Sequence, residues 1–310
     1  MDRFEAMRLF AAVAEAQSFS AAARRQGLSA PAVTRTIAAL EELLGVRLLV
    51  RTTRRVRLTE AGERYLLDCR RILADLQEAE EAAAGSHATP RGLLSITAPV
   101  MFGHLHVSPI LLRFMERYPE VRIRALFIDR VASLIDEGLD VGIRIGELPD
   151  SSLMALRVGQ VRRLVCAAPA YLERHGTPRH PAELSGHRLV TASGGPQSSE
   201  WRFQERGEPL AVALRPQFVV NTNEAAIRAA SAGWGLTRRL SYQVAGLLGS
   251  GQLRTVLDDF EPPPLPIHIV HQEGRRTSAK VRSFVDFIAA ALRGNPELNP
   301  SAAETAAARQ

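Results

Sequence analysis

The apolar residues at the start of the chain recur with the spacing of an amphipathic helix. Met7, Phe10, Ala11 and Ala14 stand at i, i+3, i+4 and i+7, so they share one helical face. The spacing is lost near Gln17. The pattern predicts a first helix that buries this face and ends at about that residue.

Two further helices are predicted directly after the first. Ser20 can cap a short helix over residues 21–26, and Gly27 supplies the left-handed backbone that ends it. Ser29 opens a third helix, which ends at Gly45. Helix, glycine-containing turn and helix form the helix-turn-helix spacing, in which the second helix of the motif enters the major groove of DNA. The third helix is predicted to bury Val33, Ile37, Leu40 and Leu44.

The third helix leaves a polar face for DNA contacts. Thr34 and Arg35 lie off the predicted buried stripe and near the helix start, where base edges are read. Residues 46–58 are apolar and β-branched, broken by the basic run 51–55, which predicts a two-stranded wing whose tip meets phosphates. For each of these polar side chains, a merely solvated position is the alternative. The predicted DNA-binding residues are Ser29, Ala30, Pro31, Thr34, Arg35, Arg51, Thr52, Arg54 and Arg55.

A long helix is predicted after the wing, with Thr59 as its cap. Apolar residues within it step by four and three positions alternately, which is the spacing of a heptad seam. We expect two chains to pair along this seam. Its residues are Tyr65, Cys69, Ile72 and Leu76, followed by Ala79 and Ala83.

Beyond a hinge at residues 85–91, predicted strands and helices alternate. This alternation predicts an α/β domain built from βαβ units around a mainly parallel sheet. The tail from Asn295 is rich in Ala, Glu and Pro and is predicted to be disordered. The predicted strands are residues 93–97, 121–127, 141–145, 165–168, 190–192, 218–220 and 267–271. The predicted helices are residues 103–118, 131–137, 224–232 and 278–292.

Length and charge distribution favour a multidomain protein that binds nucleic acid. A chain of 310 residues suits two or three domains. Residues 1–59 carry ten arginines and five acidic residues, whereas residues 60–92 carry four basic and seven acidic ones. The first segment therefore has the positive charge of a nucleic-acid module. Acidic residues stand where a signal peptide needs basic ones, and no segment is predicted to span a membrane, so we expect a cytoplasmic location.

The sequence offers little catalytic or metal chemistry. Cys69 and Cys166 are far apart and form no CxxC motif, which favours structural thiols over a redox pair. His104 and His106 would point apart on a helix, with no further ligands nearby in the sequence to complete a metal site. No GxSxG or HExxH motif occurs, and the glycines at 233–235 lack the third glycine of a dinucleotide site. We expect no enzyme activity, no cofactor and no metal.

The stretch from Phe10 to Gly62 closely resembles the signature of LysR-type transcriptional regulators. Weaker similarity continues through residues 140–146, 230–236 and 262–269. The resemblance implies a winged helix-turn-helix, a linker helix, and two Rossmann-like subdomains arranged as in a periplasmic binding protein, with a small-molecule effector between them. The matching residues include Ala22-Ala23, Gly27-Leu28-Ser29, Ala32-Val33-Thr34-Arg35, Leu44-Gly45-Val46-Arg47-Leu48 and Leu58-Thr59-Glu60-Ala61-Gly62.

The resemblance also implies domain boundaries and partners. It implies a homodimer, or a dimer of dimers, that binds an interrupted palindrome in promoter DNA. The implied divisions are a DNA-binding domain at 1–59, a linker at 60–92, an effector domain at 93–293 and a disordered tail at 294–310. Within the effector domain, subdomain I is expected at 93–162 and 267–293, and subdomain II at 163–266.

The chain departs from the family pattern at two places. Ala30 and Pro31 stand where many members carry a polar Ser or Gln, so an apolar contact with thymine methyl groups can replace a hydrogen bond. Residues 237–240 stand where many members run to Leu-Pro after the glycines. This second departure lies beside the expected effector pocket.

Effector-binding residues are expected where strands end. Residues 97–102 lead from a strand into a helix, where free N–H groups favour an anion, so we expect a polar or acidic small effector. The alternative is that Pro99, Met101 and Phe102 only fill the core. The predicted effector residues are Thr97, Ala98, Pro99, Val100, Met101, Phe102, Arg144, Ser193, Thr222 and Asn223.

Two other classes of protein share part of this organisation. A solute-binding protein has a similar C-terminal architecture but requires a signal peptide and has no winged helix. An α/β enzyme with a DNA-binding arm requires a cluster of perturbed titratable groups, for which the sequence offers no candidate.

Overall fold

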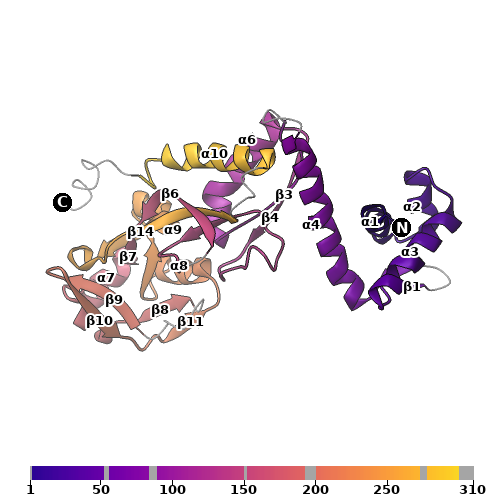
Figure 1. Ribbon diagram of the computed structural model, residues 1–310. Coiled ribbons are helices and arrows are strands. Elements are labelled where there is room, and N and C mark those ends of the chain that lie inside the picture. Colours follow the sequence, from indigo (N-terminus) through magenta and orange to yellow (C-terminus); the bar gives the residue numbers. More distant parts are fainter. Residues whose placement is uncertain are drawn as a thin grey trace. The chain divides into compact units, whose positions relative to one another are not determined.

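The chain forms two compact units, Met1–Ala88 with Thr277–Ala279 and Thr89–Arg276 with Lys280–Gln310. The computed structural model describes residues 2–51, 56–83, 89–149, 152–192, 200–272 and 278–299. Figure 1 labels the helices and strands of both units.

Three short helices build the core of the N-terminal unit: α1 (Arg3–Ala16), α2 (Phe19–Arg25) and α3 (Ala30–Leu44). The buried face of α1 is rotated from the predicted one, because its core positions also include larger apolar side chains. Of the four predicted residues, Phe10 is fully buried, and the other three are partly buried. The fully buried residues of α1 are Ala6, Leu9, Phe10 and Val13.

The helix ends are set by local hydrogen bonds. Ser18 caps α2, since its Oγ accepts a hydrogen bond from the Ala21 N–H at 3.3 Å. The prediction of Ser20 as the cap is wrong, because Ser20 already lies inside the helix. The Oγ of Ser29 caps α3 by accepting from the Ala32 N–H at 3.3 Å, as predicted. The left-handed residues that follow these helices are Gly27 (φ 67°) and Gly45 (φ 66°).

The predicted stripe of α3 is buried except at its end. Val33 and Ile37 are 0% exposed and Leu40 is 1% exposed. Leu44 shares their face but is 40% exposed, because it is the last residue of the helix and lies beyond the last buried turn. The prediction that Leu44 is buried is therefore wrong.

A two-stranded wing follows α3, as predicted. Strand β1 (Leu49–Arg51) pairs antiparallel with β2 (Val56–Leu58). Helix α4 (Glu60–Ala83) begins directly after the wing, and the Thr59 Oγ1 caps it by accepting from the Gly62 N–H at 2.9 Å.

The first turns of α4 pack against their own chain. Cys69 is 0% exposed within the same core as Phe10, and the rings of Tyr65 and Phe10 have centroids 5.5 Å apart. The prediction that Cys69 pairs two chains is therefore wrong, since its side chain has no exposed surface. Ile72 and Leu76 remain partly exposed further along the helix. The two last seam side chains lie outside the described part of the chain: Ala79 and Ala83.

The first sheet of the C-terminal unit has the strand order β4-β3-β5-β14-β6. Strand β3 runs parallel to β4 and β5, whereas β14 runs antiparallel to β5 and β6. The strands are β3 (Gly92–Ala98), β4 (Val121–Phe127), β5 (Val141–Ile145), β6 (Leu153–Val161) and β14 (Leu265–Gln272).

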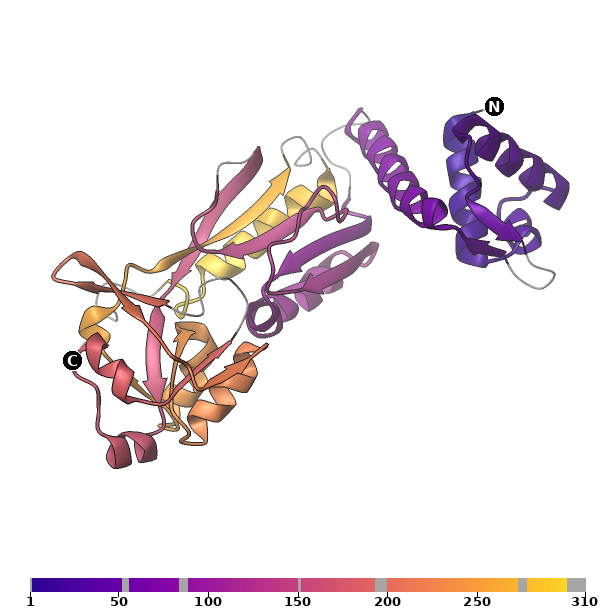
Figure 2. The same ribbon diagram turned by 90° about the horizontal axis from the view of Figure 1, so that it is seen from below.

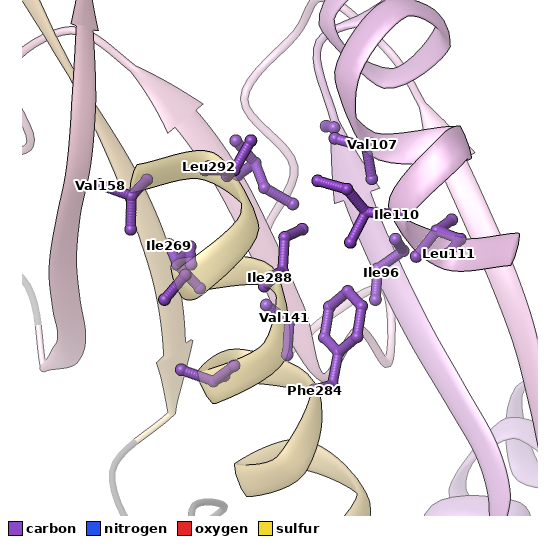
Figure 3. Packing of buried hydrophobic residues seen from close by; sticks show 14 of the residues in the cluster. Ile96, Val107, Ile110, Leu111, Val141, Val158, Ile269, Phe284, Ile288 and Leu292 are labelled. Atoms are coloured by element: carbon purple, nitrogen blue, oxygen red, sulfur yellow. The ribbon is translucent and has the colours of Figure 1, made fainter. Parts of the chain in front are cut away.

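Helices from both ends of the unit cover one face of this sheet. In Figure 3, side chains of α6 and α10 meet over the strands, with Ile110 and Phe284 facing Ile96. The rings of Phe114 and Phe284 are 5.2 Å apart in an edge-to-face contact. The covering elements are α5 (Val100–Phe102), the π-helical turn η1 (Gly103–Val107), α6 (Ser108–Arg117) and α10 (Ala279–Arg293).

The second sheet has the order β11-β8-β12-β7-β13. Alternate residues of β7 face opposite sides: Cys166 packs under the helices α8 and α9, and Val165 packs under the hairpin β9–β10 with α7. The strands of this sheet are β7 (Arg163–Ala167), β8 (Leu189–Ala192), β11 (Phe218–Val220), β12 (Leu236–Leu240) and β13 (Arg254–Val256), and the separate hairpin is formed by β9 (Glu200–Glu205) and β10 (Glu208–Ala213). The helices are α7 (Pro169–His175), η2 (Pro181–Gly186), α8 (Asn223–Ser231), α9 (Ser241–Gly249) and η3 (Asp258–Phe260).

The two sheets form two lobes of one unit, as Figure 2 shows. The chain passes from the first sheet to the second between β6 and β7, and returns between η3 and β14. Among the described strands, each five-stranded sheet joins two parallel pairs to two antiparallel pairs. In each sheet four of the five strands point the same way, in line with the prediction of a mainly parallel sheet, and the strand that follows the crossover, β7 or β14, runs in the opposite direction.

Two local predictions in the C-terminal unit are also wrong. Residues 131–137 form an irregular segment with turns and no helix, and Leu134 from this segment packs against Val270 on the open face of the first sheet. Residues 294–299 are ordered, although the composition predicts disorder from 294. Leu298 is 0% exposed, and the Gln160 N–H donates to its carbonyl oxygen at 3.0 Å.

Candidate DNA-binding and effector sites

Helix α3 presents the residues expected to meet DNA. Arg35 is exposed and Thr34 is half-buried, on the side away from the buried Val33. Pro31 is exposed in the first turn, and Ala30 packs partly against the core. The Ser29 Oγ accepts the cap hydrogen bond from the Ala32 N–H, which fixes the start of the helix.

Glu41 fixes α3 to the wing. Its Oε1 accepts hydrogen bonds from the Leu48 N–H at 2.7 Å and the Leu49 N–H at 3.0 Å. A carboxylate that accepts two backbone N–H groups holds both elements in one geometry. Sequence reasoning missed this residue, because the contact joins a helix to a strand through a side chain whose direction the periodicity does not give.

The described wing adds two exposed arginines that the sequence reasoning did not select. Arg47 precedes β1 and Arg57 lies in β2, and both are exposed. The sequence signals were the excess of arginine in this segment and, for Arg47, its place in the motif at residues 44–48 that resembles the family signature. Of the predicted wing contacts, the Arg51 side chain and three whole residues lie outside the described part: Thr52, Arg54 and Arg55.

The anion-binding site predicted at residues 97–102, after β3, is filled by groups of the protein itself. Thr97 and Ala98 are 5% and 2% exposed, so neither presents its side chain to a solute. The Val100 N–H, expected to be free, donates to Oδ1 of Asp129 at 3.0 Å. The expectation of a free N–H at Val100 is therefore wrong, because a carboxylate from the end of β4 caps α5.

Asn223 lies at the boundary between the two lobes. Its Nδ2 donates to the Asp129 Oδ2 at 3.4 Å, and its Oδ1 accepts from the Arg239 Nη1 at 2.7 Å. Thr222 caps α8, with Oγ1 accepting from the Ala225 N–H at 3.3 Å. The structure thus brings Val100 and Asn223 into one hydrogen-bonded chain through Asp129. The sequence had pointed to Arg239 only as a departure from the family pattern.

The remaining predicted effector residues do not join this network. Arg144 donates from Nη2 to the Ala132 carbonyl oxygen at 2.9 Å, and partial burial lowers the pKa of its guanidinium. Phe102 is fully buried in the core of the first lobe. Ser193 lies outside the described residues.

A pocket of about 630 Å³ opens between α5–η1 and the helices α8 and α9. Of the predicted effector residues, Met101 lines this pocket, whereas Asn223 is not among its lining residues. It is therefore separate from the network around Asp129. Its walls are Met101, His104, Leu105, Glu224, Ile227, Arg228, Ser231, Gln243, Leu247 and Gln252.

The described residues offer neither a metal site nor a membrane span. Within the described ranges, no three or more His, Cys, Asp or Glu side chains are grouped so as to hold a metal ion. No helix among the described residues has the length and apolar character needed to cross a membrane.

A helix-turn-helix with a wing, joined to a two-lobed α/β unit, defines a DNA-binding regulator with a ligand-binding domain. Sequence families agree with this class. Residues 4–63 match the bacterial regulatory helix-turn-helix protein, lysR family, and residues 87–293 match the LysR substrate binding domain. The chain belongs to the LysR family of transcriptional regulators.

Individual relatives cover nearly the whole chain. An HTH-type transcriptional regulator of Xanthomonas campestris is 36% identical over 288 residues, 92% of this chain and 84% of that protein. An HTH-type transcriptional repressor of Pseudomonas aeruginosa is 32% identical over 300 residues, 96% and 95% of the two chains. The full-length structure of the Vibrio cholerae virulence activator AphB is similar with a TM-score of 0.59 and 31% identity, covering 92% of this chain and 97% of that one.

Membership confirms several predictions at once. The predicted fold class, an N-terminal winged helix-turn-helix with a two-subdomain α/β effector domain, is confirmed. The LysR family is a family of regulators and not of enzymes, so the prediction that the chain has no enzyme activity is confirmed. Regulators of this family bind DNA through the helix-turn-helix, bind small-molecule effectors in the substrate-binding domain, and oligomerise.

Proposed function

We propose that the chain binds an interrupted palindrome in promoter DNA as a homodimer or dimer of dimers, and that a polar or anionic effector held between its two lobes changes this binding. The observation that carries the proposal is the outward placement of Thr34 and Arg35 on a helix whose other face is buried. Two-fold pairing of such helices requires half-sites of matching symmetry. The site of action is the cytoplasm, where promoter DNA lies.

Footprinting on the DNA that flanks the gene tests the DNA-binding part. Arg35→Ala should cost about 1–3 kcal/mol of binding free energy at a cognate site and relax the base preference at one position, because a base contact is lost. Arg54→Ala should weaken binding to all sequences and make the salt dependence shallower by about one counterion. Purified protein that prefers no duplex site over random DNA at moderate salt contradicts the proposal.

The dimer seam is proposed for the part of α4 that its own chain leaves open. Ile72 and Leu76 are partly exposed there, whereas Cys69 is already buried. The double variant Ile72→Asp with Leu76→Asp should convert the protein to a monomer in analytical ultracentrifugation, because two charges would be desolvated at the seam. Arg64→Ala, on an exposed face of the same helix, should leave the oligomer intact. A double variant that stays dimeric contradicts this seam.

The effector is proposed to bind at the boundary of the lobes and to act through its different affinity for their arrangements. The candidates with exposed surface are Pro99, Val100, Met101, Arg144, Thr222 and Asn223, and Ser193, outside the described residues, stays a candidate from the sequence alone. We propose the functional divisions 1–59, 60–92 and 93–293, with subdomain II at 163–266. The chain crosses between the sheets after β6 and before β14, which supports the proposed start and end of subdomain II.

A metabolite screen by thermal shift tests the effector site, since a ligand stabilises the state to which it binds.

A further inference from the structure

Arg239 is a buried cation with only neutral hydrogen-bond partners. It is 8% exposed on β12, and its Nε and Nη1 donate to the Thr237 Oγ1 at 2.8 Å and to the Asn223 Oδ1 at 2.7 Å. Among the described residues, no carboxylate lies within ion-pair distance of it. Burial lowers the pKa of its guanidinium to about 10, which reflects the cost of removing this charge from water.

A carboxylate of the same chain, that of Asp129, is linked to this cation through one intervening side chain, Asn223. Asp129 is exposed at the end of β4 in the first lobe, and its two oxygens accept from the Val100 N–H and from the Asn223 Nδ2. The amide of Asn223 therefore connects the two charges, with its oxygen toward Arg239 and its nitrogen toward Asp129. Donors on both lobes already hold one carboxylate at this place.

The position is reachable and crosses the lobe boundary. Asn223 is half-buried and Asp129 is exposed, so a solute can approach both from solvent. Val100 and Asp129 belong to the lobe of the first sheet, and Asn223 and Arg239 belong to that of the second. A ligand that replaces one partner of this network changes a contact between the lobes.

We propose that Arg239 and Asn223 form the subsite for the carboxylate group of the effector, and that Asp129 is an internal competitor that occupies the donors when the effector is absent. This inference rests on the proposed effector function and adds the charge class of the ligand and the residue that selects it. A carboxylate gives Arg239 the ionic partner that it lacks and forms charge-assisted hydrogen bonds with it.

Binding at this subsite releases a contact between the lobes. The amide of Asn223 exchanges Asp129 for the ligand, because two carboxylates cannot share one small site without repulsion. The lobes then lose the hydrogen bond between Asp129 in the first lobe and Asn223 in the second. The effector thereby favours a different arrangement of the lobes, which is the requirement for a ligand to shift a conformational equilibrium.

The neighbouring residue provides a matched control. Arg238 lies on the opposite face of β12, where its guanidinium carbon is 5.0 Å from the centroid of the Phe203 ring, and burial lowers its pKa to about 10 as well. Arg238→Gln therefore removes a half-buried cation from the same strand without touching Asn223. Arg239→Gln removes the proposed ligand partner.

The experiment measures the unfolding midpoint of the full-length protein with sodium acetate or sodium phenylacetate, each compared with its amide at equal ionic strength. The wild type and Arg238→Gln should be stabilised by the carboxylates and not by the amides, and Arg239→Gln should lose this difference. Asp129→Asn keeps an acceptor for the Val100 N–H but removes the competing charge. It should lower the half-saturating concentration of carboxylate at least threefold.

Three results overturn the inference: equal effects of carboxylate and amide on the wild type, a full carboxylate effect in Arg239→Gln, or weaker carboxylate binding in Asp129→Asn. The last of these remains decisive if Arg239→Gln does not fold. Selection of a duplex site by the wild type is measured in parallel. Failure of that selection contradicts the proposed function, whereas failure of the carboxylate response with intact DNA selection contradicts the subsite alone.

Discussion

Glu41 and Leu48 are joined by a hydrogen bond of 2.7 Å, from the backbone N–H of Leu48 to Oε1 of Glu41. This contact ties the recognition helix α3 to the strand that begins the wing. The contact holds α3 and the wing in one fixed geometry, as a helix-turn-helix that meets DNA with both elements requires.

Replacement of Glu41 should weaken both folding and DNA binding. Glu41→Ala leaves the N–H groups of Leu48 and Leu49 without an acceptor, which should lower the free energy of unfolding by about 1–3 kcal/mol. Denaturant titration and binding to footprinted DNA measure the two effects. The neighbouring Glu42 is exposed, so Glu42→Ala should change stability by less than about 0.5 kcal/mol. Equal stability of the two variants would sink the assignment.

Gly62 should tolerate no side chain. A Cβ at this position would lie 2.0 Å from the carbonyl oxygen of Leu48, which is backbone and cannot rotate away. We expect Gly62→Ala to lower the free energy of unfolding by about 3 kcal/mol through this overlap. The helical Gly246 has open space around it, so Gly246→Ala should be neutral or slightly stabilising. Thermal unfolding of both variants decides the matter.

His106 should make stability depend on pH. Burial lowers the pKa of its imidazole below the ordinary value of 6.5. Asn295 donates to its Nδ1 at 3.3 Å, since the other end of that amide, Oδ1, accepts from the Glu297 N–H. Nδ1 is therefore the acceptor, and the neutral ring fits this site.

The sign of the pH effect follows from this lowered pKa. The unfolded chain binds the His106 proton more readily, so the contribution to stability is complete above pH 6.5 and is lost as the pH falls below it. His106→Gln should flatten the fall of the unfolding midpoint between about pH 7 and pH 5.5, the window just above and below the ordinary histidine pKa. Burial raises the pKa of Glu297, so its contribution to stability is lost as the pH rises above the ordinary value of 4.5, which is opposite in sign to that of His106. The variant Glu297→Gln separates the effects of the two groups. An unchanged profile in His106→Gln contradicts the prediction.

The segment after α10 should be part of the folded domain. Leu298 is 0% exposed in the core of the first lobe, and the Asn299 Nδ2 donates to the Val158 carbonyl oxygen at 3.2 Å. Leu298→Ala should cost about 2–5 kcal/mol, as for other fully buried leucines. A chain that ends after residue 299 should unfold like the full-length protein, and one that ends after residue 294 should be destabilised. Equal midpoints for the two truncations would show that the segment does not contribute.

Periodicity and capping chemistry in the sequence were enough to predict the N-terminal helices, the wing and the heptad-like α4. These signals are local, because a helix is specified by residues three and four apart and by the polar residue that precedes it. The order of apolar and glycine positions from Phe10 to Gly62 was also enough to recognise the family. Thr34 and Arg35 could be placed on the outer face for the same reason.

The effector region depended on contacts that have no sequence period. Asp129 and Asn223 are 94 residues apart, and their meeting, like that of Asn223 with Arg239, exists only once two sheets have formed and the chain has crossed between them twice. The direction of β14 between β5 and β6, and the burial of Cys69 against α1, were likewise decided by packing. Local spacing determined the helices of the N-terminal unit and most of the buried stripe of α3. The tertiary fold decided which face of α1 is buried and left residues 131–137 without a helix, because burial is a property of the neighbours that distant parts of the chain supply.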